Sequence, residues 1–140
     1  MKRLKLIITH PLLIILLFCG IIISGEEMGG FYLLYILLGL PHFVIHSILG
    51  ISGIFCLMLA YYIKKSKGYL FNIFGASCMC GSLIYFFIQP NASYNYGTFH
   101  ETLPMITLCA FGALVTYFII SNSIQFIADL KKSRQLPPLV

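Results

Sequence analysis

Three histidines of this 140-residue chain lie where they could bind a metal ion or a haem iron. His42 and His46 are four residues apart, a spacing that puts both imidazoles on one face of a helix. His100 and Glu101 are adjacent in a later polar stretch. Imidazole nitrogens and carboxylate oxygens are common ligands of divalent metals, so these four residues predict a metal site. The alternative cofactor is haem b, with one ligand from the 42/46 pair and His100 opposite.

The elements that position these residues are apolar helices. The chain is 59% hydrophobic and 9% charged, with a mean hydropathy of +0.94. Soluble domains carry about 25% charged residues. The five cysteines include no Cys-x-x-Cys pair, which argues against a disulfide framework or a zinc finger. We therefore expect an all-α integral membrane protein with one membrane domain over residues 1–140.

Four apolar runs are long enough to cross a bilayer, which predicts a bundle of four transmembrane helices arranged as two helical hairpins. The predicted spans are residues 6–24, 41–63, 69–88 and 104–127. A further apolar run over residues 31–40 is too short to cross, and a Gly-Leu-Pro break separates it from the second span. We expect this run to form a short interfacial helix at the outer surface.

The basic residues predict the orientation. All nine occur in three clusters at the ends of apolar runs: Lys2, Arg3, Lys5, Lys64, Lys65, Lys67, Lys131, Lys132 and Arg134. The positive-inside rule makes residues 1–5, 64–68 and 128–140 cytoplasmic, with outer loops at 25–40 and 89–103. We predict a bacterial inner (plasma) membrane protein with both termini inside. Nucleic acid is not an expected partner, because no basic patch interleaves with stacking aromatics outside the membrane.

This orientation sorts the polar residues into two groups. Glu26 and Glu27 join the histidines on the outer side. A second polar cluster is predicted near the cytoplasmic boundary, from His10, Asn122, Gln125 and Asp129. Ionisable groups within spans are costly and often functional. Groups close to a boundary are equally explained by snorkelling or by a helix-end hydrogen bond. The outer histidines are equally explained by hydrogen bonds to loop backbone, tyrosines or water.

Small residues predict close packing of the helices. They fill residues 75–82, in the middle of the third span, and they form one face of the second and of the fourth: Gly53, Cys56 and Ala60; Cys109, Gly112, Ala113, Thr116 and Ser123. Small residues allow membrane helices to approach closely. Because the sequence shows no nucleophile–base pair or phosphate loop, it favours a non-catalytic subunit or accessory protein, in a homo-oligomer or a larger membrane complex. Metal or haem binding is the first alternative, and a small proton-coupled carrier or channel acting as an oligomer is the second.

Overall fold

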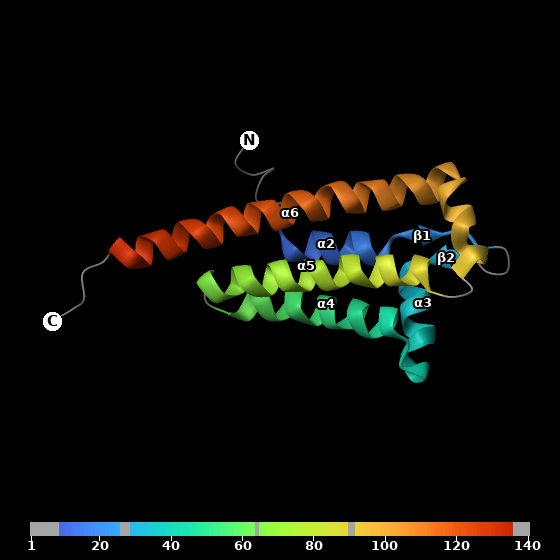
Figure 1. The fold of residues 1–140 in the computed structure, drawn as a ribbon, viewed down its shortest axis with the longest axis horizontal. Coiled ribbons are helices and arrows are strands. Elements are labelled where there is room, and N and C mark those ends of the chain that lie inside the picture. The colour runs from blue at the N-terminus through green and yellow to red at the C-terminus, as the bar shows by residue number, and fades with distance from the viewer. Residues whose placement is uncertain (1–8, 26–28, 64, 90–91, 136–140) are drawn as a thin grey trace.

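The computed structural model describes residues 9–25, 29–63, 65–89 and 92–135, and these are almost entirely helical. Three helices are long and apolar enough to cross a membrane. They are α4 (Ile45–Tyr62), α5 (Lys65–Ile88) and α6 (Thr102–Gln135). The shorter helix α2 (Pro11–Cys19) lies beside them, between α6 and α5 in Figure 1. At 1.5 Å per residue, α4 is about 27 Å long and α6 about 51 Å.

The two ends of the bundle differ in composition. The turn between α4 and α5 and the C-terminal part of α6 lie at one end, called the lysine end because it carries Lys67, Lys131 and Lys132. The opposite end, called the hairpin end, holds the strands β1 (Ile22–Ile23) and β2 (Gly30–Phe31) and three short helices. These are α3 (Tyr32–Gly39) and the 3₁₀ helices η1 (Leu40–His42) and η2 (Ala92–Phe99). Helix α3 runs across the bundle rather than along it (Figure 1).

Helix α2 ends after nine residues although the apolar run continues. Gly20 is its C-cap, and three isoleucines follow at 21–23, a β-branched run that favours extended backbone. Strand β1 then pairs antiparallel with β2. The predicted span over 6–24 therefore differs from the structure, which is helical over 11–19 and extended beyond Gly20; residues 6–8 lie outside the described part of the chain.

The extended segment after α2 is held by hydrogen bonds from distant parts of the chain. The Ile22 N–H donates to the Thr107 hydroxyl at 3.1 Å, and the Ser24 N–H donates to the Thr98 hydroxyl at 3.0 Å. The Thr98 hydroxyl in turn donates to the Ser24 carbonyl at 3.2 Å. Ile21 and Ile23 are fully buried. Non-helical backbone is stable in apolar surroundings only where protein groups satisfy it, which is what the two threonines do.

Helices α5 and α6 extend beyond their predicted limits at the lysine end, whereas α4 begins at Ile45, four residues after the predicted start at residue 41, and ends at Tyr62. Helix α5 begins four residues before the predicted span 69–88, and α6 continues past the predicted end at residue 127. Residues expected to form a cytoplasmic connection and tail are thus helical over 65–68 and 128–135. Lysine, glutamine and leucine are good helix formers, so the helix persists where the apolar run stops.

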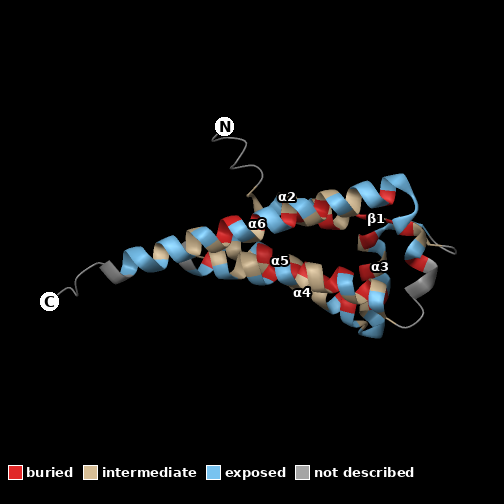
Figure 2. Cartoon of the chain, turned by 45° about the horizontal axis from the view of Figure 1, so that its top comes forward, coloured by how far each residue is buried: buried red, intermediate tan, exposed pale blue. Residues whose placement is uncertain are grey.

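Helices α4 and α5 pack at backbone distance through two glycines. A Cβ added to Gly53 would lie 2.7 Å from the Gly75 carbonyl oxygen, and one added to Gly75 would lie 2.8 Å from the Gly53 carbonyl oxygen. Helix α5 also packs against α6 on another side, so it lies between the other two long helices. Buried positions face the neighbouring helices and the outward faces are exposed (Figure 2).

Candidate functional site

His46 is a buried histidine in the first turn of α4, at the hairpin end, with 5% of its surface exposed. Its ring packs edge-on against Phe86, with ring centroids 5.1 Å apart, and lies 6.4 Å from the Tyr32 ring. Neither imidazole nitrogen has a hydrogen-bond partner in the described part of the chain.

A chain of buried hydrogen bonds joins three helices beside this histidine. Ser82 of α5 donates its hydroxyl proton to the His46 carbonyl oxygen at 2.6 Å. The Tyr32 hydroxyl of α3 lies 2.8 Å from the same serine oxygen, and because the serine proton is already used, Tyr32 is the donor of this second bond. Burial raises the pKa of the Tyr32 phenol, and the bond with Ser82 opposes that shift in part.

Helix α3 packs closely against the start of α4 at Gly39. A Cβ at this position would collide with the Ser47 hydroxyl and would come within 3.4 Å of the His46 Nε2 atom. Ser47 is fully buried, and its hydroxyl has no partner among the described residues. Since the Ser82 proton goes to a backbone carbonyl and not to the imidazole, the described residues of this junction form no nucleophile–base pair. The geometry is that of a structural joint between α3, α4 and α5.

The structure places His42 and His46 on different elements, which corrects the prediction that they share one helix face. His42 is exposed at the end of η1, whereas α4 begins only at Ile45. Between them, Phe43 has a left-handed backbone with φ of 53°, which interrupts any helix over these residues. The helical i, i+4 geometry on which a metal-binding pair would rest is therefore absent.

The other predicted outer ligands also lie apart from His46. His100 and Glu101 are exposed just before α6, and Glu101 accepts a hydrogen bond from the Ser24 hydroxyl. Glu26 and Glu27 lie outside the described residues. In the ranges that the structure describes, no group of three or more His, Cys, Asp or Glu residues could hold a metal ion. Metal or haem binding stays a prediction from the sequence.

Asn122 and Gln125 of the predicted cytoplasmic cluster have separate partners at the lysine end. Asn122 accepts a hydrogen bond from the Asn72 side chain at 2.8 Å, which ties α6 to α5. Gln125 lies 3.5 Å from the Ser121 hydroxyl on its own helix. Asp129 is half-buried on α6.

His10 has a structural role of its own. It precedes α2, and its Nδ1 atom accepts the N–H of Leu12 at 3.3 Å. His10 is therefore the N-cap of α2, a position normally taken by Ser, Thr, Asp or Asn, and this is the helix-end hydrogen bond that the sequence offered as one explanation of the residue.

Several residues that matter in the structure were missed from the sequence. Asn72 is an isolated amide in an apolar run, and that signal could have identified it as a helix-packing contact. Thr98, Thr107 and Ser82 gave no such signal, because hydroxyl side chains are common in membrane helices and their partners are more than 35 residues away. Their roles depend entirely on the tertiary fold.

One face of α6 has no neighbour within the described structure. We call it the α6 small-residue face, and it consists of Cys109, Gly112, Ala113 and Thr116. A Cβ added to Gly112 would meet nothing within 4 Å, and the other three residues are exposed. The Thr116 hydroxyl donates to the Gly112 carbonyl oxygen at 2.8 Å, so the face presents no unpaired hydroxyl proton. By contrast, Gly53 of α4 and Gly75 of α5 lie against each other.

Comparison with known proteins gives no further assignment. No family model matches the chain, and neither the curated proteins nor the solved structures contain a match.

Proposed function

We propose that this chain is an integral protein of a bacterial inner membrane, with both termini in the cytoplasm. It acts as a non-catalytic subunit that binds another membrane helix through the α6 small-residue face. That helix belongs either to a second copy of the chain or to a partner in a larger complex. The unfilled surface at Gly112 carries this proposal, because small residues in a membrane helix allow a second backbone to approach closely.

The exposed surface of the long helices supports a membrane location. Large apolar side chains point outward along all three, including Phe55, Phe74 and Ile120, each more than half exposed. Soluble monomers rarely expose contiguous apolar patches larger than a few hundred Å², whereas lipid covers such surfaces without cost. The lysines at one end then give the orientation by the positive-inside rule.

The first part of the chain supports a fourth crossing of unusual form. Helix α2 contributes about 14 Å of height from nine residues, and the four residues 21–24 beyond the Gly20 cap add roughly 13 Å. The sum of about 27 Å is close to the usual hydrocarbon thickness of about 30 Å. A short helix followed by an extended segment therefore covers the same height as a continuous span, with its irregular half enclosed by protein.

The α6 small-residue face can be tested by filling it. Replacing Ala113 by leucine adds bulk at the exposed centre of the face, and overpacking of a close contact costs about 1–3 kcal/mol, or roughly 5- to 150-fold in affinity. Ser77→Leu is the matched control, because Ser77 is also small and exposed but lies on α5. Assembly is measured by light scattering in mild detergent and by oxidative cross-linking at Cys109 in membranes.

We expect the wild type to resist carbonate extraction and to form an assembly that Ala113→Leu dissociates and Ser77→Leu preserves. Cross-linking between two Cys109 thiols identifies a second copy of the chain as the occupant. A stoichiometric second protein that is lost in Ala113→Leu identifies a heteromeric complex. A wild type that stays monomeric without a bound protein, or equal effects of the two variants, contradicts the proposal.

A further inference from the structure

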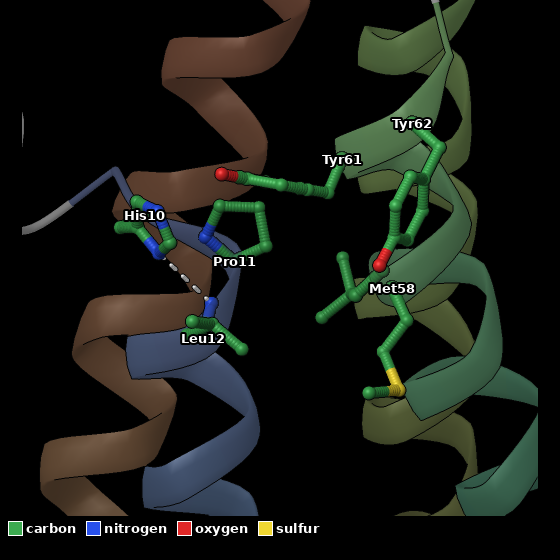
Figure 3. Close-up of a pocket in the computed structure, with 7 residues that line it drawn as sticks. His10, Pro11, Leu12, Met58, Tyr61 and Tyr62 are labelled. Atoms are coloured by element: carbon green, nitrogen blue, oxygen red, sulfur yellow. Dashed lines mark hydrogen bonds between the residues drawn. The ribbon is translucent and has the colours of Figure 1, made fainter.

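A groove lies at the lysine end, between the start of α2 and the last turns of α4. Its volume is about 280 Å³, and its lining residues are His10, Pro11, Leu12, Leu57, Met58, Tyr61 and Tyr62. Figure 3 shows Tyr61 extending from α4 toward His10, and the ring centroids of the two are 6.3 Å apart. The Tyr62 ring runs back along α4 toward Met58 (Figure 3). The groove is thus a gap between α2 and α4, and Tyr61 and Tyr62 line part of it.

The polar groups of the groove are hydrogen-bond donors. His10 accepts the Leu12 N–H at its Nδ1 atom, so the neutral imidazole carries its proton on Nε2. Two phenol hydroxyls supply the other donors, and none of the lining residues is acidic. Lys67, in the first turn of α5, adds an exposed positive charge at the same end. This set of groups is complementary to an anion.

The rest of the groove is complementary to a hydrocarbon chain. Leu57 is fully buried at its base, and Leu12 and Met58 are about half exposed along its walls. The tyrosines are far more open, with 70% of Tyr61 and 84% of Tyr62 exposed. His10 and Tyr61 place two donors beside each other at one end of an apolar trough, which matches the two parts of a phospholipid, whose phosphate lies at the depth where tyrosines and lysines gather.

We propose that this groove binds one phospholipid with an anionic headgroup. One acyl chain lies over Leu12 and Met58, and the phosphate accepts hydrogen bonds from Tyr61 and His10. The inference rests on the proposed membrane orientation, which places the lysine end at the cytoplasmic leaflet, where Lys67 attracts negative headgroups.

A second hollow on the same molecule provides an internal comparison. It has about 270 Å³ of space and is lined by Leu70, Phe71 and Phe74, near the lysine end of α5. The two hollows are of similar size, but the lining of the second offers no hydrogen-bond donor. An acyl chain alone would occupy both hollows, whereas a specific headgroup contact distinguishes the first.

The test is native mass spectrometry of the detergent-purified full chain with added lipid. Phosphatidylglycerol and phosphatidylethanolamine with identical acyl chains are compared, so that only the headgroup differs. Tyr61→Phe removes one donor without changing the volume, and Met58→Trp fills the trough. Leu70→Trp fills the second hollow and is the matched control.

We expect one phosphatidylglycerol to bind more tightly than phosphatidylethanolamine, because both lipids offer the phosphate but only the first has a net negative charge for Lys67 to attract. Loss of a hydrogen bond to a charged phosphate in Tyr61→Phe should weaken that binding by about tenfold. Met58→Trp should abolish it and Leu70→Trp should leave it unchanged. Equal binding of the two lipids, no effect of Tyr61→Phe, or equal loss in both tryptophan variants overturns the inference. Because carbonate extraction tests membrane location separately, a failure here is distinguishable from a failure of the proposed function.

Discussion

The contact between Gly53 and Gly75 makes a sharp prediction about stability. A Cβ at residue 75 would lie 2.8 Å from the Gly53 carbonyl oxygen and 3.1 Å from the Leu57 side chain. The carbonyl is part of a helix backbone and cannot move alone, so α4 and α5 must separate. Overpacking of this kind costs about 1–3 kcal/mol. Alanine has a higher intrinsic helix preference than glycine, which stabilises the variant by roughly 1 kcal/mol. The free energy of unfolding of Gly75→Ala should therefore fall by about 0–2 kcal/mol.

Gly81→Ala isolates the steric part of this effect. Gly81 lies on the same helix, and its added Cβ would meet only the Leu49 side chain, at 3.8 Å, an ordinary contact. Both variants gain the same helix preference of alanine over glycine. The free energy of unfolding of Gly81→Ala should therefore be roughly 1 kcal/mol above that of the wild type and about 1–3 kcal/mol above that of Gly75→Ala. The measurement is reversible unfolding in mixed detergent micelles, followed by circular dichroism.

A double variant then tests whether the two glycines share one contact. Once Gly75→Ala has moved α4 and α5 apart, the space for a Cβ at residue 53 already exists. Gly53→Ala should therefore lower the free energy of unfolding by less in the Gly75→Ala background than in the wild type. The reasoning is refuted if Gly75→Ala is as stable as Gly81→Ala. It is also refuted if the stability loss of the double variant equals the sum of the losses of Gly53→Ala and Gly75→Ala.

Two further predictions concern buried hydroxyl groups. Ser82→Ala removes the link between Tyr32 and the His46 carbonyl, and we expect a loss of about 1–3 kcal/mol in the same unfolding assay, since buried partners are left unsatisfied. A change below the error of the assay would show that water replaces the serine. Thr107→Val keeps the side-chain shape but leaves the Ile22 N–H unpaired, so amide hydrogen exchange at residues 21–24 should accelerate; unchanged exchange would contradict the role assigned to Thr107.

Apolar length predicted the long helices well. The three runs that became α4, α5 and α6 are long and apolar enough to cross a membrane. The second span was predicted to begin at residue 41, whereas α4 begins at Ile45, after the left-handed Phe43. The helix limits were less predictable, because hydropathy marks where a segment is apolar and not where its backbone stops being helical. Lysines that were assigned to a loop and a tail therefore lie on helices.

The candidate site was less predictable for a different physical reason. The pairing of His42 with His46 assumed a continuous helix over both residues. Phe43, which lies between them, has a left-handed backbone that interrupts the helix, so the assumption was wrong. The sequence does not predict a left-handed backbone at a phenylalanine, because residues other than glycine rarely adopt a positive φ. The burial of His46 likewise depends on α3 folding across the bundle end, a tertiary event that residue spacing does not encode.

The extended segment after α2 has a consequence for the order of assembly. Residues 22 and 24 take their hydrogen bonds from Thr107 and Thr98, which lie 85 and 74 positions further along the chain. A continuous helix would satisfy its own backbone groups as it forms, whereas these two N–H groups can pair with the threonine hydroxyls only after those residues have been synthesised. Strand β1 therefore reaches its final hydrogen bonding only after the start of α6 has formed beside it.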